Sequence, residues 1–146
     1  MGFFGAVRQG RKDDVELGKG LWRRAHDRFH RGLDRYHQVL EGVDDEQLYN
    51  ELVEIANELA ELSVRVRTIC VEAQKRSPSD GLDVPGALAG VHRALSKAGN
   101  SLATTAEAAA MLRLAVGPVP VGALSVRRRA ESVFEQVADA ERQLGD

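Results

Sequence analysis

The sequence predicts an all-α fold, an up-down antiparallel four-helix bundle made of two long helical hairpins. Apolar residues recur at alternating steps of three and four in four segments, and breaks rich in glycine and proline separate most of these segments. Hydrophobic residues make up 43% of the chain and charged residues 29%, which is typical of globular proteins. At 146 residues the chain can bury a core without disulfides or metals. We therefore expect a single helical domain over residues 1–146.

The first helix is expected at about residues 14–41. An aromatic residue stands at every seventh position in Trp22, Phe29 and Tyr36, and Val43 continues the series. Such a repeat places all four side chains on one helix face. The pattern weakens before Trp22, so residues 1–13 are expected to form a flexible or capping N-terminal segment.

Three further helices are expected at about residues 45–76, 84–116 and 122–144, each with apolar residues at heptad spacing. Asp44 and Gln47 resemble a capping box at the start of the second helix. The main break covers residues 77–86, which contain two prolines, and the break at 117–122 contains two more. Proline ends one helix and suits the first turn of the next, so both breaks are expected to separate helices.

Short connections make consecutive helices antiparallel neighbours. A two-helix hairpin alone buries little apolar surface, so we expect the two hairpins to share one core. The alternative is a pair of independent coiled-coil hairpins that meet their partners separately.

The single cysteine, Cys70, excludes an intramolecular disulfide and favours a reducing compartment. Residues 1–12 place their few apolar residues before the basic ones, the reverse of a secretory signal. No run of apolar residues in the sequence is long enough to predict a membrane-spanning helix. The sequence therefore predicts a cytoplasmic protein, with peripheral contact to a membrane left open.

Charges are unevenly distributed along the chain. Residues 1–37 carry nine Lys or Arg against five Asp or Glu, whereas residues 44–61 carry seven Asp or Glu and no Lys or Arg. We expect the two segments to pair within a hairpin, and the alternative is an external partner. The net charge of −2 argues against a dedicated nucleic-acid binder.

One metal site is conceivable in a bundle of this kind. His26 and His30 lie one helical turn apart, but Asp27 stands where zinc proteases carry a glutamate. A mononuclear site could combine His26, Glu58 and His92 from three helices. The ordinary alternative is that these histidines pack at helix interfaces. No serine, cysteine or lysine has an identifiable base beside it and no cofactor motif is present, so an enzyme is not expected.

Two surfaces are candidates for contact with a partner or a membrane. Three arginines stand near the start of the fourth helix, where positive charge opposes the helix dipole. The N-terminus places two aromatic residues ahead of three basic ones. The candidate contact residues are Phe3, Phe4, Arg8, Arg11, Lys12, Arg127, Arg128 and Arg129.

The leading functional hypothesis is a non-enzymatic helical interaction or adaptor module that joins a protein assembly or a homo-oligomer. One alternative is a metal-binding bundle that uses the histidines of the first helix and the glutamates of the second. Another is peripheral membrane association through the N-terminal aromatic and basic segment, which by itself would bind weakly.

Overall fold

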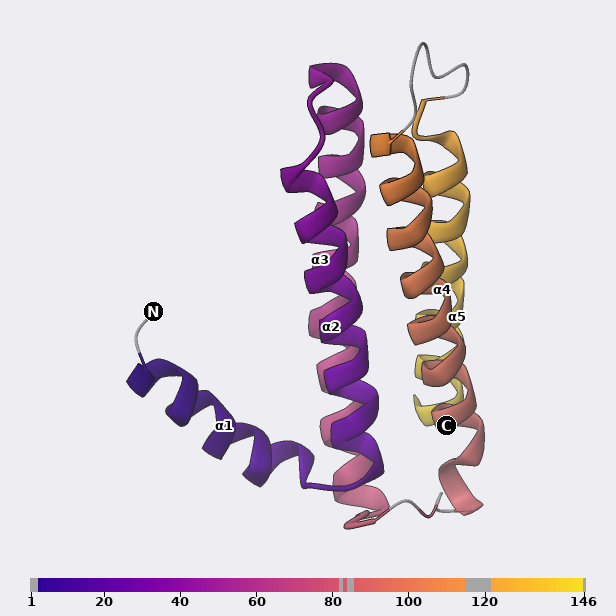
Figure 1. Cartoon of the computed structure of the whole chain (residues 1–146). Coiled ribbons are helices and arrows are strands. Elements are labelled where there is room, and N and C mark those ends of the chain that lie inside the picture. Colours follow the sequence, from indigo (N-terminus) through magenta and orange to yellow (C-terminus); the bar gives the residue numbers. More distant parts are fainter. Residues whose placement is uncertain (1–2, 82, 84–85, 115–121, 146) are drawn as a thin grey trace.

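The computed structural model describes residues 3–81, 83, 86–114 and 122–145 (Figure 1). These residues form five α-helices and one short 3-10 turn, and they contain no strand. The helices are α1 (Phe3–Leu17), α2 (Leu21–Glu41), α3 (Glu46–Arg76), α4 (Ala89–Leu114) and α5 (Leu124–Gly145), and the turn η1 (Gly86–Leu88) precedes α4. The all-α prediction is confirmed, but five helices replace the four that were predicted.

The additional helix arises because the segment predicted as one helix over 14–41 is divided at residues 18–20. Gly18 has a φ of 73°, a left-handed conformation that commonly ends a helix. The backbone N–H of Leu21 donates to Ser79 Oγ (3.1 Å), so a residue far along the chain caps the start of α2. Residues 3–13, expected to be a flexible or capping segment, belong to α1.

The other predicted boundaries agree with the structure to within a few residues. Asp45, not Asp44, caps α3, because its Oδ1 accepts a hydrogen bond from the Leu48 N–H (2.8 Å). Helix α4 begins at Ala89 rather than at 84, after η1. Residues 84–85 and 115–116, predicted as the two ends of this helix, lie outside the described residues.

The predicted apolar seams form the core. Most of the apolar residues at heptad spacing in α2, α3 and α4 are buried. In α5 all six are buried, namely Val126, Ala130, Val133, Val137, Ala140 and Leu144. Two buried side chains also tie segments together through hydrogen bonds. Tyr36 donates its hydroxyl to the Leu52 carbonyl (2.8 Å), and Trp22 donates Nε1–H to the Ser77 carbonyl (2.9 Å).

Helices α2, α3, α4 and α5 pack side by side, and each hairpin is antiparallel, as predicted (Figure 1). The contacts between hairpins are different, because α2 packs on α4 and α3 on α5 with their chains running in the same direction. Trp22 lies against His92, and Gly32 lies against Leu102. A Cβ on Gly32 would lie 3.0 Å from Leu102 Cγ, so the missing side chain permits this close parallel approach. An arrangement in which all neighbours are antiparallel is therefore wrong.

Candidate interaction surfaces

The predicted metal ligands begin with His26, which is buried between α2 and α3. Its Nδ1 lies 2.9 Å from Asp27 Oδ1, and its Nε2 lies 3.5 Å from Arg67 Nη1. Both ring nitrogens therefore have polar neighbours within the protein. The arginine at the second nitrogen is a cation, which is unfavourable beside a bound metal ion.

The other two candidate ligands lie on different flanks of the bundle. Glu58 pairs with Arg127 of α5, and the His92 ring packs edge-on against Trp22 with ring centroids 6.2 Å apart. In the described parts of the chain, no group of three or more His, Cys, Asp or Glu could hold a metal ion. The structure does not bring His26, Glu58 and His92 together.

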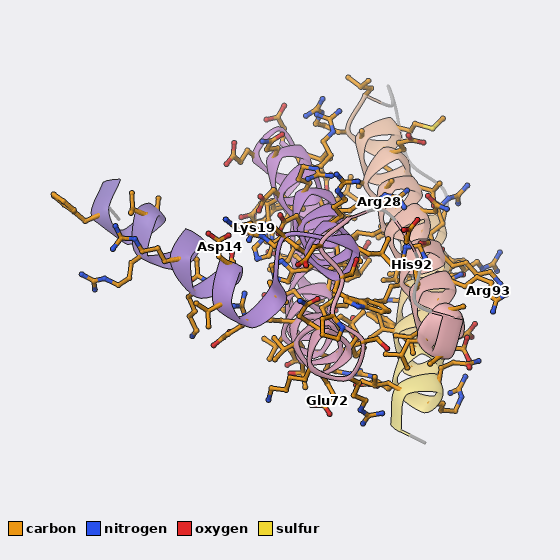
Figure 2. The ribbon with its side chains drawn as sticks, turned by 90° about the horizontal axis from the view of Figure 1, so that it is seen from below. Asp14, Lys19, Arg28, Glu72, His92 and Arg93 are labelled. Atoms are coloured by element: carbon orange, nitrogen blue, oxygen red, sulfur yellow. The ribbon has the colours of Figure 1, made fainter. Side chains whose placement is uncertain are left out.

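Helix α1 projects sideways from the bundle and is attached at one end (Figure 1). Its acidic half, residues 13–17, provides the attachment. Arg67 of α3 pairs with Asp13 (2.8 Å) and Glu16 (2.7 Å), and Arg23 of α2 pairs with Asp14 (2.8 Å). Figure 2 shows Asp14 at this junction.

The same ion pairs shift the pKa values of two carboxyl groups. Burial by itself raises the pKa of Asp13, but hydrogen bonds from Arg67 and Gln9 and the charges of Arg67 and Arg23 bring it below its ordinary value. The hydrogen bond from Arg67 is the main reason that the pKa of Glu16 is also lowered. Both acids are therefore charged at neutral pH, and α1 stays attached through them.

The basic half of α1, residues 4–12, lies beyond this attachment. Arg8, Arg11 and Lys12 are exposed, and so are the apolar side chains of Phe4 and Val7, with 79% and 37% of their surfaces accessible. Phe3 is the first residue of α1, but its side chain lies outside the described part of the chain. The structure thus gathers the candidate residues of the N-terminus on a projecting helix.

The three arginines of α5 are divided between two environments. Arg127 pairs with Glu58 across the α3–α5 interface, whereas the sequence predicted that the acids of residues 44–61 would pair with the basic residues of 1–37. Arg128 and Arg129 are exposed. Arg129 also lines a hollow of about 480 Å³ between α4 and α5, together with Met111 and Leu112.

An acidic surface covers the start of α3, at the end of the bundle opposite to α1. We call it the acidic end. Its side chains surround a hollow of about 550 Å³ and are Glu46, Gln47, Asn50, Glu51 and Glu54. Glu51 is partly occupied within the chain, since its Oε2 accepts from the Ala123 N–H (3.3 Å). The remaining acids face solvent.

A fourth surface was missed in the sequence. Four exposed arginines of α2 stand at steps of four, three and four residues, the spacing of one helix face, and we call them the arginine stripe: Arg24, Arg28, Arg31 and Arg35. The spacing is visible in the sequence, where it is the signal of a shared helix face. Arg24 and Arg28 also line a hollow of about 190 Å³ between α2 and α4, with His92 and Ser96.

Desolvation in this hollow lowers the pKa of His92.

None of the described helices combines the length and apolarity needed to cross a membrane. In comparisons with family models, with curated proteins and with solved structures, none matches this chain.

Proposed function

We propose that the chain is a non-enzymatic helical interaction module that self-associates through α1. One observation carries the proposal: α1 is fixed to the bundle by its acidic half, while its basic half extends from the bundle with exposed cationic and apolar side chains. A projecting helix with a rigid attachment is suited to contact another molecule, because little ordering is needed on binding.

The complementary surface is the acidic end of a second copy. Its exposed carboxylates Glu46 and Glu54 match the charges of Arg8, Arg11 and Lys12. The contact cannot form within one chain, because α3 has 31 residues and is about 46 Å long. Helix α1 has 15 residues, a length of about 22 Å, and is attached at the far end of α3. The pairing must therefore join different molecules.

Such a contact joins two different surfaces, the basic half of α1 and the acidic end. Every dimer therefore keeps one unoccupied copy of each surface. The contact thus propagates into a ring or an open chain of subunits. Charge pairing also makes the association weaken at high salt. We expect a mass that rises with protein concentration and falls as salt is added.

The test is light scattering coupled to size-exclusion chromatography on a charge-reversal pair. One variant carries Arg8→Glu and Arg11→Glu, and the other carries Glu46→Lys and Glu54→Lys. Each variant alone is expected to remain monomeric, whereas an equimolar mixture recovers association because opposite charges face each other again. Arg128→Glu with Arg142→Glu, two exposed arginines of α5, is the matched control and should associate like the unaltered chain.

A wild-type chain that stays monomeric at every concentration would contradict self-association. Association that survives both reversals, or fails to return in the mixture, would place the contact elsewhere.

A second candidate function is peripheral association with an anionic membrane through the same half of α1. Exposed Val7 and Phe4 beside three basic residues favour it, because interfacial helices combine apolar insertion with attraction to acidic lipids. Flotation with vesicles containing phosphatidylserine tests it. Binding abolished by Arg8→Glu with Arg11→Glu, together with a monomeric chain in solution, would favour the membrane over the second copy.

A further inference from the structure

The arginine stripe carries a charge that the protein itself does not neutralise. Arg23, Arg65 and Arg67 each pair with carboxylates. In contrast, no carboxylate oxygen of a described residue lies within 4.0 Å of the nitrogens of Arg24, Arg31 or Arg35. Arg28 donates to the neutral amide oxygen of Asn100. Like charges one helical turn apart destabilise a helix, so this row has no internal structural benefit.

The stripe borders the hollow between α2 and α4. Arg24, Arg28, His92 and Ser96 line it, and Leu21, Ala25 and Leu95 form its apolar floor. Figure 2 shows Arg28 and His92 on neighbouring helices at this interface. Guanidinium groups offer paired N–H donors with the geometry of phosphate oxygens, and an imidazole and a hydroxyl add further donors. The hollow therefore offers hydrogen-bond donors to a phosphate group, and the stripe extends away from it.

We propose that the arginine stripe and its adjoining hollow bind the phosphodiester backbone of a nucleic acid. From Arg24 to Arg35 the helix rises about 16 Å, a length over which one strand of B-DNA carries about five phosphates. A straight row of four guanidinium groups on a rigid helix therefore matches a linear polyanion better than a single small anion. This site is independent of the self-association proposed for α1.

Two observations favour a nucleic acid over a membrane at this surface. The exposed large apolar side chains of the described residues lie on α1, α3, α5 and the far end of α4, and none lies on α2. The aromatic residues of α2, namely Trp22, Phe29 and Tyr36, are buried and cannot stack on bases or enter lipid. Binding is therefore carried by phosphates alone, without preference for base sequence.

The net charge of −2 does not oppose this site, because the four arginines of the stripe outnumber the two aspartates of α2 beside them. The acidic end covers only the start of α3. On α2, Asp27 and Asp34 stand three or four residues from arginines of the stripe and therefore adjoin it, but Asp27 is already paired with Arg23. Electrostatic attraction to a polyanion depends on the local distribution of charge rather than on the net charge of the whole chain.

The experiment is fluorescence anisotropy of a labelled DNA duplex of arbitrary sequence, titrated with the full chain at several salt concentrations. A duplex of about 20 base pairs is longer than the stripe and is therefore sufficient. The test variant carries Arg24→Gln, Arg31→Gln and Arg35→Gln, which leaves the Arg28 contact with Asn100 intact. The control removes the same charge elsewhere, with Lys75→Gln, Arg128→Gln and Arg142→Gln, all exposed. Circular dichroism verifies that both variants remain helical.

The unaltered chain is expected to bind duplexes of different sequence equally, with affinity that falls steeply as salt rises. The stripe variant should lose affinity at least about tenfold at about 100 mM salt, and its log–log salt slope should become shallower by about 3 units. The control should keep the slope.

Three outcomes overturn the proposal. They are absence of DNA binding at about 50 mM salt, an equal loss of affinity in the control variant, and binding to phosphatidylserine vesicles without binding to DNA. Self-association does not account for a selective loss in the stripe variant, because its α1 and acidic end are unchanged.

Discussion

Gly20 decides how closely the α1–α2 junction approaches the linker that follows α3. A Cβ at this position would lie 2.1 Å from the Ser79 carbonyl oxygen, which is backbone and cannot rotate away. Gly20→Ala must therefore displace the linker and with it the Ser79 cap on α2. We expect a loss of about 1–3 kcal/mol of stability, measured by urea unfolding followed by circular dichroism.

Gly81→Ala is the matched control for this substitution. Gly81 belongs to the same linker, and a Cβ there would meet nothing within 4 Å. Its stability should change by less than about 0.5 kcal/mol. Equal effects of the two substitutions would show that the contact with Ser79 is unimportant.

At the residue scale, the sequence predicted which side chains are buried better than it predicted which ones meet. The heptad seams identified the buried residues because burial depends on helical period alone. The three candidate metal ligands do not meet because a loop length fixes only the level of a residue along its helix. It does not fix the flank toward which the residue points: His26 faces Arg67, Glu58 faces Arg127, and His92 faces Trp22.

At the scale of the element, α1 depends on one residue of α3, Arg67, for the ion pair of Glu16 and for the shorter ion pair of Asp13. Arg67→Gln removes the partner of Glu16 and the nearer partner of Asp13, which keeps only the longer contact with Arg23, so the attachment should weaken and α1 should open more often. Hydrogen exchange read by mass spectrometry should show amides of residues 3–17 losing protection, by up to about tenfold for two partly exposed ion pairs. Amides of α2 and α3 should be unaffected.

Arg65→Gln provides the control, since Arg65 pairs with Glu141 on α5 and not with α1. Acidification offers an independent check. The attached state lowers the pKa values of Asp13 and Glu16, so their contribution is complete above the ordinary values of 3.8 and 4.5 and is lost as pH falls through the lowered values. Loss of protection in α1 already at pH 6 would be inconsistent with these carboxylates as the anchor.

The division into α1 and α2 was the main error at this scale. Gly18 and Gly20 flank a single lysine, and together they signalled a break. The Ser79 cap on α2 could not be predicted from the sequence, because it comes from 58 residues away.

At the scale of the whole molecule, Cys70 reports on global opening. The thiol is fully buried, and burial, followed by the charge of Asp27, raises its pKa to about 12. An aromatic disulfide reagent at pH 8 should therefore label it only as fast as the bundle unfolds, and at once in concentrated guanidinium. Rapid labelling of the native chain would mean that the core opens locally around α3.

The direction of the contacts between hairpins has a kinetic consequence. Antiparallel hairpins bring together residues close in sequence, whereas the parallel contacts join residues 72 positions apart at Arg28 and Asn100 and 69 apart at Glu58 and Arg127. Loop closure makes such distant contacts slow to form. Each hairpin should therefore collapse early by itself, and the docking of one hairpin on the other should set the folding rate.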